Sequence, residues 1–490
     1  DSNWGSRRSR SAQDTSTVKE LHYDIAHLRL HEYASMENDA KACYDRMVPN
    51  LIMLISRSFG ISRGACRSVG KTFQKTRHHL TTKNGISKES FGYSNANPIF
   101  GSWQGATKSV VNWVLTSSII QNIHQATTEG ATFQSTGGEI EVRQSTVGFV
   151  DDNNNCVSQL RGQGSIVEKL KNSAQKWERL LYATGGMLEL SKCFTYVINW
   201  EQDNQGRHKI SDKMQAITIQ ESQTGQTKEI NQKSTGESHK TLGCYKSPAM
   251  NMKAQAEDTT KKAEKISQLT CSYGLSANTS RLAYRSVYLP AVTYPLTSLY
   301  MSKRVLDKAQ AKATRRFLRC HGFNPHMPRI VAYAPKLLGG LGMQRMYITQ
   351  GVSSTTQMLK HITAGSTIGK LFRIAISWLQ RWAGIGHCIM QRPDREIPPT
   401  SSKMLMSIRE FLTECRATIR INKNPRVKRL HDTFIMDHIM YSNFSRQKIN
   451  MANKVRLYLQ VETVSDISNS DGNKIEKSWL QEGQKPSTST

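Results

Sequence analysis

Hydrophobic and polar residues follow two different periods along this chain. Strand-like alternation runs through residues 139–150 and predicts a β-hairpin, with Ile140 and Val142 on one arm. Two more short strands are predicted around a Thr-Gly turn in residues 216–230. From residue 255 onward, helical spacing dominates. The pattern therefore predicts mixed strands and helices in the first half of the chain and helices in the second.

Two helices of the first half carry apolar sides. The first follows a glycine-rich loop within residues 98–125, and its predicted apolar side holds Val110, Val114, Ile119 and Ile123. The second ends at Gly185 and Gly186, with an apolar side formed by Val167, Leu170, Ala174, Trp177 and Leu181. Both helices are expected to bury these sides.

The stretch GFVDDNNN, residues 148–155, places Asp151 next to Asp152 at the tip of a predicted strand. Adjacent like charges repel each other, and the cost grows when they are partly buried. A solvated turn is one explanation, because Asp and Asn are common turn residues. A bound cation is the alternative, since it would relieve the repulsion.

The overall charge narrows the class of partner. Among 490 residues, 67 are Lys or Arg and 38 are Asp or Glu, which gives a net charge of +29. An excess of this size favours a polyanionic partner such as nucleic acid. Residues 303–320 show it locally: Leu306, Ala309, Ala313 and Phe317 form one helical face, and another carries Lys308, Lys312, Arg315, Arg316 and Arg319. That basic face is either solvated or follows a phosphate backbone.

Other classes of protein are disfavoured. The sequence contains no run of about 18 apolar residues, so neither a membrane span nor a membrane partner is expected. Its nine cysteines form no Cys-x-x-Cys pair, which argues against a zinc site or a disulfide framework. We expect an intracellular protein of the nucleus or cytoplasm, not a secreted one.

A magnesium site at the aspartate pair would need more oxygen ligands. Two-metal phosphoryl transfer takes carboxylates from more than one element of the chain. Asp39, at a predicted strand-to-helix junction, is the upstream candidate, and Tyr44 follows it. The segment GSWQG, with Gln104 and Gly105, lies before the pair, and GGMLELSKC, with Lys192, lies after it.

The order of these segments resembles the palm of a reverse transcriptase of the non-LTR retrotransposon type. That family has an Asp with an aromatic five residues on, as in DAKACYD, and a Gln-Gly that leads a helix, as in GSWQG. An aromatic-x-Asp-Asp hairpin matches FVDD, Gly-x-Leu with a nearby Lys matches GGMLELSKC, and a later Leu-Gly matches HKTLGCYKSP. The resemblance covers residues 30–345.

The resemblance implies a two-metal site. Asp39 and Asp151 would ligate two Mg²⁺ ions, or Mn²⁺ in their place. Asp152 would support the site or share in ligation, and the backbone carbonyl of Ala40 would be an extra ligand. Lys192 would neutralise or protonate the pyrophosphate leaving group.

The resemblance also implies contacts with substrates. Tyr44 would be a steric gate that excludes a 2′-hydroxyl, and Gln104 and Gly105 would contact the incoming nucleotide or the template base. A hairpin at Leu242 and Gly243 would hold the primer. The implied partners are an RNA template, a DNA primer and dNTPs, with the basic face of residues 303–320 along the nucleic acid.

The implied fold is α+β, a right-hand polymerase palm of antiparallel sheet backed by helices, with a helical thumb and a helical C-terminal region. The expected divisions of the chain are a polar lead or remnant of fingers (1–30), a palm with part of the fingers (31–210), a primer-grip-like hairpin segment (211–250), a basic thumb-like region (251–345), a helical C-terminal region (346–475) and a disordered tail (476–490). The implied activity is RNA-directed DNA polymerisation as part of a retrotransposon polyprotein.

Two alternatives remain. The fingers of the family should precede the aspartate at position 39, so the chain is expected to be an N-terminally truncated fragment of the polymerase, and whether it is active without the fingers stays open. A non-catalytic nucleic-acid-binding relic is the first alternative. A nuclease, or another polymerase with a similar carboxylate site, is the other alternative. Intact Asp39, Asp151 and Asp152 favour retained chemistry, and Tyr44 with the Gln-Gly pair favours a polymerase over a nuclease.

Overall fold

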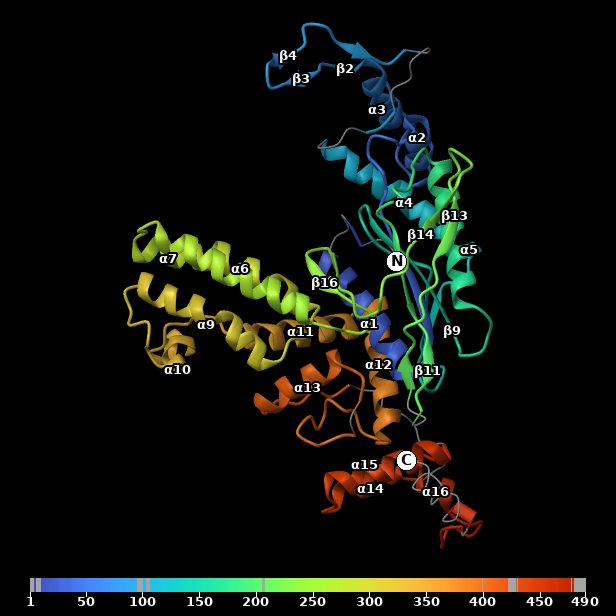
Figure 1. The fold of residues 1–490 in the computed structure, drawn as a ribbon, viewed down its shortest axis with the longest axis vertical. Coiled ribbons are helices and arrows are strands. Elements are labelled where there is room, and N and C mark those ends of the chain that lie inside the picture. Colours follow the sequence, from blue (N-terminus) through green and yellow to red (C-terminus); the bar gives the residue numbers. More distant parts are fainter. Residues whose placement is uncertain are drawn as a thin grey trace.

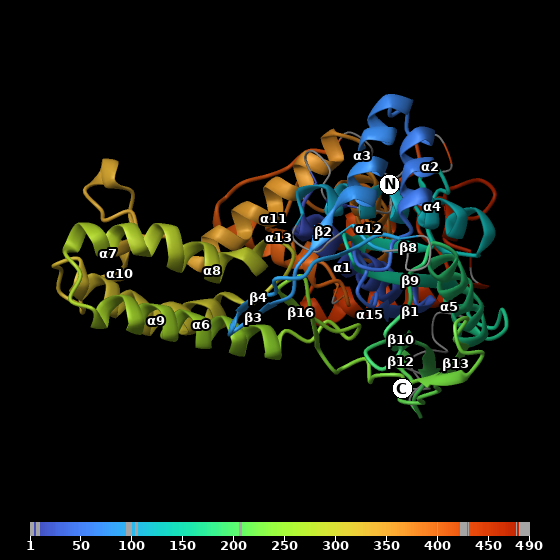
Figure 2. The ribbon, with the colours of Figure 1, turned by 90° about the horizontal axis from the view of Figure 1, so that it is seen from above.

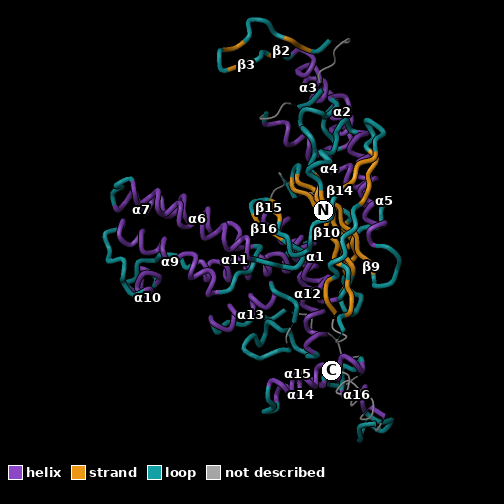
Figure 3. The backbone as a smooth tube through the Cα atoms, viewed as in Figure 1, coloured by secondary structure: helices purple, strands orange, loops and turns teal. Residues whose placement is uncertain are grey.

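The computed structural model describes residues 4–5, 10–94, 100–102, 106–204, 208–398, 400–421, 429, 431–476 and 478–479. A four-stranded antiparallel sheet lies at its centre, with the strand order β10-β1-β9-β8 (Figure 1). The strands are β1 (Glu32–Asn38), β8 (Thr146–Phe149), β9 (Asp152–Gln159) and β10 (Phe194–Ile198). Figure 3 separates these strands from the helices around them.

Three helices cover the sheet: α1 (Ala12–Arg29), α4 (Thr107–Thr127) and α5 (Ile166–Ala183). Successive side chains of a strand point to opposite faces. Ala34 and Met36 of β1 accordingly belong to the core with α4 and α5, whereas Tyr33 belongs to the core with α1. The predicted α+β class, an antiparallel sheet backed by helices, is confirmed.

The α5 helix has the buried side that the sequence predicted, formed by Val167, Leu170, Ala174, Trp177 and Leu181. The Ser165 hydroxyl caps it by accepting from the backbone N–H of Glu168. The capped, amphipathic helix packs along β9 and β1 and supports the sheet from this face.

The α4 helix forms where it was predicted, but it buries a different side. Val110 is half-buried and Ile123 is 42% exposed, although both were placed on the apolar side. Gln121 and His124 are buried instead. Both make hydrogen bonds to polar groups of the sheet and of α5. The spacing of apolar residues could not identify the buried side of α4, because the contacts of that side are largely polar.

The predicted hairpin of residues 139–150 is wrong in its pairing. β7 (Glu141–Gln144) pairs with β6 (Ala131–Gln134), across the turn-forming segment STGGE. β8 pairs with β9, so a second hairpin has the two aspartates at its turn. Each run of turn residues closes its own hairpin, because turn residues and not apolar arms set the pairing.

The α1 helix is polar and yet buried along nearly its whole length. The segment expected as a polar lead or remnant of fingers (1–30) thus contains an ordered helix at residues 12–29. A capping box between Ser11 and Asp14 fixes its start. The buried polar side chains of α1 include Thr15, Ser16, Thr17, Lys19, Glu20, His22 and Asp24.

The polar side chains of α1 find partners in three other parts of the chain. Lys19 pairs with Glu37 of β1 at 2.8 Å, Glu20 pairs with Lys246 at 2.8 Å, and Asp24 accepts from the Ser402 hydroxyl at 2.7 Å. Buried charges need such partners, because an unpaired one is costly. The helix is thus held by the sheet, by the hairpin that contains Lys246 and by the C-terminal region.

Helices predominate after residue 252, as predicted. α6 (Lys253–Ser272) and α9 (Lys303–Cys320) pack along each other and project to one side of the sheet (Figures 1 and 2). The others are α7 (Ala277–Ala283), α8 (Leu289–Thr293), α10 (Arg329–Tyr333), α11 (Met346–Thr363), α12 (Thr367–Ala383), α13 (Met404–Glu414), α14 (Ile435–Tyr441), α15 (Arg446–Leu459) and α16 (Val464–Ile467). No helix in the described ranges is long and apolar enough to cross a membrane.

Short strands complete the fold. An arm between β1 and α4 contains α2 (Pro49–Ser58), α3 (Arg63–Lys75), β2 (Arg77–His78), β3 (Thr81–Thr82), β4 (Gly85–Ile86) and β5 (Phe91–Gly92). Three hairpins follow β10: β11 (Trp200–Gln202) with β12 (His208–Ile210), β13 (Ile217–Gln220) with β14 (Thr227–Ile230), and β15 (His239–Thr241) with β16 (Cys244–Lys246). The strands predicted in residues 216–230 are confirmed.

The buried pair of Glu20 and Lys246 gives a test of how α1 is held. Both side chains are at most 4% exposed. We expect Lys246→Ala to lower the free energy of unfolding by about 3–5 kcal/mol, because it leaves a buried carboxylate unpaired. Chemical denaturation followed by circular dichroism measures this loss. The double variant Glu20→Gln/Lys246→Met should lose less, and Lys209→Ala, in an exposed pair with Glu201, should leave the midpoint nearly unchanged. A Lys246→Ala midpoint equal to that of Lys209→Ala would contradict the assignment.

Candidate functional site

The antiparallel register brings Asp39 to the aspartate pair. Asn38, the last residue of β1, pairs with Asn153 of β9. Continuing this register by one residue sets Asp39 opposite Asp152. Asp151 lies in the tight turn between β8 and β9. Asp39 and the aspartate pair, which are far apart in the sequence, therefore lie at the same end of the sheet.

Lys192 reaches the same end of the sheet from the side of β10. Its Nζ lies 3.1 Å from Oδ2 of Asp39. The hydrogen bond to Asp39 and the charge of that carboxylate raise the pKa of Lys192 above its ordinary value, so the ammonium is charged at neutral pH. The two side chains are 68% and 43% exposed, respectively. The ammonium is thus the counter-ion of an accessible carboxylate.

The backbone fixes the direction of the Ala40 carbonyl. The N–H of Lys41 donates to the carbonyl of Met187, and the N–H of Glu189 donates to the carbonyl of Asp39, both at 2.8 Å. These bonds flank the antiparallel bridge between Ala40 and Leu188. In such a bridge the N–H and C=O of the central residue point away from the partner. The Ala40 carbonyl therefore points away from residues 187–189.

The tip of the aspartate hairpin is strained. Val150 has a φ of 58°, in the left-handed region that β-branched residues avoid. Such a conformation costs on the order of 1–3 kcal/mol and persists only where the surroundings hold it. Here the Trp113 indole N–H of α4 donates to the Val150 carbonyl at 2.6 Å. One buried side chain of α4 therefore fixes the turn that presents Asp151.

The local electrostatics reflect the convergence of carboxylates. Partial desolvation raises the pKa of Asp152, the charge of Lys19 opposes it, and the charges of Asp151, Glu37 and Asp39 add to the rise. On the other side of the turn, desolvation and the nearby charges of Cys43 and Asp151 raise the pKa of Tyr44 to about 12. Tyr44 also meets Trp113 edge-on, with ring centroids 6.5 Å apart.

The donor set fits Mg²⁺ only in part. Across the described ranges, no three His, Cys, Asp or Glu side chains form a ready cluster for a metal ion. Mg²⁺ does not require one, because it is commonly bound by one or two carboxylates together with substrate phosphates and waters. Asp39, Asp151 and Asp152 supply carboxylates at one place, and all the donors are hard oxygen atoms. The residues are therefore of the chemical type that Mg²⁺ uses with a phosphate substrate, but in the described part of the chain they do not form a closed set of three ligands.

Two residues beside the carboxylates were missed by the sequence reasoning. Lys19 of α1 is buried and pairs with Glu37, and its charge opposes the rise in the pKa of Asp152 that desolvation causes. Trp113 of α4 holds the hairpin tip. No local pattern marked Lys19, because it lies in the segment expected only as a polar lead or remnant of fingers. Trp113 was passed over because it lies off the predicted apolar side of α4.

A layer of buried amides supports the hairpin from the α4 and α5 side. Gln121 donates to Asn153 at 2.8 Å, and Asn38 donates to Asn155 across the two strands. His124 bridges the Ser145 hydroxyl and the Ser173 carbonyl, both at 2.9 Å. The asparagines of GFVDDNNN that begin β9 are therefore packing residues and not a solvated turn.

Of the remaining predicted contacts with nucleotide and primer, only Leu242 and Gly243 belong to the described part of the chain. Gln104 and Gly105 fall outside the described residues. Leu242 and Gly243 form the turn of β15 and β16, with φ of 48° and 79°. Tyr294 donates to the Leu242 carbonyl at 3.0 Å and leaves no room for a Cβ at Gly243. The predicted hairpin is present, and it is anchored to the helical region.

The basic residues of α9 divide into two groups. Lys308, Arg315 and Arg319 are exposed. Lys312 pairs with Glu264 of α6 at 2.9 Å, and Arg316 donates to the Glu264 carbonyl at 3.0 Å. The predicted apolar face, Leu306, Ala309, Ala313 and Phe317, is buried. Part of the basic face thus serves the packing of α9 on α6, and three cations stay accessible.

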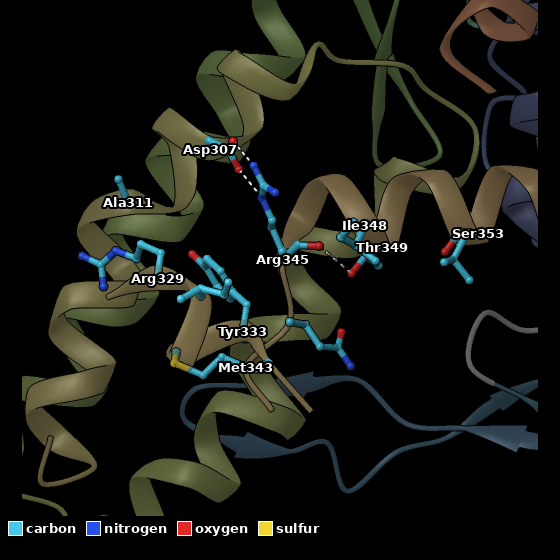
Figure 4. Close-up of a pocket in the computed structure, with 13 residues that line it drawn as sticks. Asp307, Ala311, Arg329, Tyr333, Met343, Arg345, Ile348, Thr349 and Ser353 are labelled. Atoms are coloured by element: carbon cyan, nitrogen blue, oxygen red, sulfur yellow. Dashed lines mark hydrogen bonds and ion pairs between the residues drawn. The ribbon is translucent and has the colours of Figure 1, made fainter. Parts of the chain in front are cut away.

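A cavity of about 950 Å³ lies between α9, α10 and α11 in the helical region (Figure 4). On the wall of this cavity, Arg345 donates two hydrogen bonds to the carboxylate of Asp307, and the one from Nε is 2.8 Å long. None of the residues that line it belongs to the carboxylate site. Its Arg–Asp pair braces the helices.

Comparisons with known proteins give only a remote likeness. No protein-family model and no curated protein matches the chain. Among solved structures, it is similar to telomerase from Candida tropicalis in complex with a TWJ fragment of telomeric RNA, at 12% identity and a TM-score of 0.32, covering 92% of this chain and 53% of that one. A Candida albicans telomerase in complex with a TWJ fragment of telomeric RNA gives 12% identity and a TM-score of 0.27, with 73% and 55% covered. The chain spans about half the length of these structures, and a likeness this remote carries no functional conclusion.

The bond from Trp113 to the hairpin tip can be tested with a matched pair. Trp113→Phe keeps the ring but removes the donor, so we expect the hairpin amides around Asp151 to exchange hydrogen faster and the protein to lose about 1–3 kcal/mol. Trp200→Phe is the control, because its indole donates to the His31 carbonyl at 2.8 Å. Equal protection of the hairpin in both variants, measured by hydrogen exchange, would contradict the role of Trp113.

Proposed function

We propose that this chain carries the palm and thumb-like part of a reverse transcriptase, which synthesises DNA on an RNA template as part of a non-LTR retrotransposon protein. The observation that carries the proposal is the meeting of Asp39, Asp151, Asp152 and Lys192 at one end of an antiparallel sheet. These residues come from three separate sequence motifs of the resemblance. If the motifs matched by chance, there would be no reason for their residues to lie close together.

The proposed reaction joins a nucleotide to the primer. The primer 3′-oxygen forms a bond to the α-phosphorus of a dNTP, the bond from that phosphorus to pyrophosphate breaks, and the 3′-hydroxyl proton is lost to solvent. Two Mg²⁺ ions, when held by Asp39, Asp151 and the Ala40 carbonyl, would supply activation of the 3′-hydroxyl and charge stabilisation at the phosphates. Asp152, beside them, supports the ligand set.

The ion pair between Lys192 and Asp39 suggests a role for Lys192 in this reaction. It now neutralises Asp39 at 3.1 Å. With the carboxylate engaged by a cation, the ammonium would be free to pair with the pyrophosphate and protonate it as it leaves. General acid catalysis of this kind contributes about 10²–10⁴-fold to a rate. The exposure of both side chains allows that exchange of partners.

Tyr44 and the covered faces of the sheet suggest where substrates enter. The ring of Tyr44 is half-buried between Trp113 and the side of Asp151, a position suited to packing under the sugar of a nucleotide. α1 and the α4–α5 pair cover the two faces of the sheet. Substrates would therefore reach the carboxylates from the exposed strand ends.

The first test is primer extension with an RNA template, a DNA primer, dNTPs and Mg²⁺. We expect Asp151→Asn to abolish extension, because it removes a metal ligand without changing the size of the side chain. Asp212→Asn, at an exposed position outside the site, should extend like the unchanged chain. Equal extension by Asp151→Asn and by the unchanged chain would contradict the site, whereas no extension by either, with RNA binding intact, is the result expected of a fragment that is inactive alone or of the non-catalytic relic.

A second test concerns the sugar. Tyr44→Ala should raise the incorporation of ribonucleotides relative to deoxyribonucleotides, because the smaller side chain leaves room for a 2′-hydroxyl. Tyr44→Phe is the control, since it keeps the ring and should keep the selectivity. Competition between dNTPs and NTPs in single-nucleotide extension measures the ratio. An unchanged ratio in Tyr44→Ala would remove Tyr44 from the nucleotide site.

A further inference from the structure

The arm between β1 and α4 is tied at its base to the site. The backbone N–H of Gly101 donates to Met47, and that of Ser102 donates to Tyr44, both at 2.7 Å. Gly101 has a φ of 95°, and a Cβ there would lie 2.6 Å from the Cα of Asp45. Only glycine allows this close approach. The arm therefore leaves and returns beside Tyr44, and α2 rests on α4 (Figure 1).

The α3 helix of the arm is amphipathic but almost wholly exposed. Arg63, Arg67, Lys71 and Lys75 are spaced four residues apart, which places them in one helical stripe. All four are exposed. Cys66, Val69 and Phe73 occupy the opposite side, and of these Cys66 is buried. The helix thus turns a row of cations to solvent.

The positive charge continues into the hairpins of β2 to β5. Arg77, Lys83 and Lys88 are exposed there, and Glu89 is the single acidic residue in 57–94 of the sequence. Within the described ranges, no ion pair links a basic side chain of α3 or of these hairpins to a carboxylate. Uncompensated charge of one sign attracts a polyanion. It also distinguishes the arm from α9, where Lys312 already pairs with Glu264.

Exposed rings and aliphatic groups lie among these cations. Phe59 is 51% and Phe91 is 54% exposed, and Leu80 and Ile86 are 65% and 68% exposed. Phe91 stacks on His78 with ring centroids 5.3 Å apart and an angle of 27° between the planes. Exposed rings next to a basic groove are the means by which proteins bind unpaired bases. A paired duplex hides its base faces and could not use them.

We propose that this arm binds the unpaired RNA template strand ahead of the carboxylate site. The inference rests on the proposed function, because in template-directed synthesis the unpaired strand next to the primer end is the template. The basic row of α3 would contact its phosphates, and the exposed rings would stack on its bases. In both views the arm points to the same side of the sheet as α6 and α9 (Figures 1 and 2). A template bound there would enter on the side where the basic helices lie.

The test compares two triple variants that remove the same charge from helices. The arm variant is Arg63→Gln/Arg67→Gln/Lys71→Gln. The control is Lys171→Gln/Lys176→Gln/Arg179→Gln on α5, which lies across the sheet from α1. Fluorescence anisotropy measures binding of an unpaired RNA oligonucleotide against salt. We expect the arm variant to lose at least about tenfold in affinity and its log–log salt slope to fall by about 2, since each phosphate contact on a single strand contributes about 0.7. The control should bind like the unchanged chain.

Three outcomes would overturn the proposal. Equal binding by the arm and control variants would remove the arm from the RNA contact, and so would failure of the unchanged chain to bind unpaired RNA. An equal loss of affinity for a fully paired RNA–DNA duplex would contradict the preference for an unpaired strand, and Phe91→Ala, which should weaken only the unpaired RNA, checks the same point. Circular dichroism shows that the variants are folded. Because binding is measured without extension, a chain that binds through the arm and yet does not extend a primer would show that this chain is not by itself a working polymerase, and it would leave RNA binding by the arm intact.

Discussion

The position of β1 between β9 and β10 is the constraint on which the site depends. Antiparallel pairing on both sides of one strand fixes what lies next to its end, and here that end is Asp39. One neighbour supplies Asp152, and the other leads back to Lys192, which pairs with Asp39 at 3.1 Å. A slip of one residue in either register would turn the side chains of that strand to the opposite face. The positions of these side chains are therefore set by the backbone pairing of the strands.

Buried polar contacts hold that pairing in place. On one face, asparagines of β9 bond to α4 and α5. On the other, α1 places Lys19 against Glu37 and carries charged partners for Lys246 and Ser402. Such contacts stabilise less than apolar packing of the same area, but they fail if one partner is lost. These contacts favour one register of the strands over others, and they join the strained hairpin tip to the rest of the molecule.

The sequence allowed part of this arrangement to be predicted. Where apolar residues alone mark the buried side, as in α5 and in the apolar face of α9, the prediction is confirmed. Where burial is polar, it failed: the helix α1 was not predicted within the polar lead, the buried side of α4 was misplaced, and β7 was paired with the wrong strand. The period of apolar residues reflects the free energy gained when apolar side chains leave water. It carries no information about hydrogen bonds between distant segments. For the same reason the role of Lys19 depends on tertiary contacts that no local pattern contains.

The most direct test of the central claim is to look for the cations themselves. Crystals of the chain with an RNA template, a DNA primer ending in a 3′-deoxynucleotide and a dNTP, soaked in Mn²⁺, would report metal positions by anomalous scattering. The account predicts anomalous peaks between Asp39 and Asp151, with Lys192 released from Asp39. Density for bound nucleic acid without a peak at these carboxylates would contradict it, and the aspartate pair would then be no more than a strained turn.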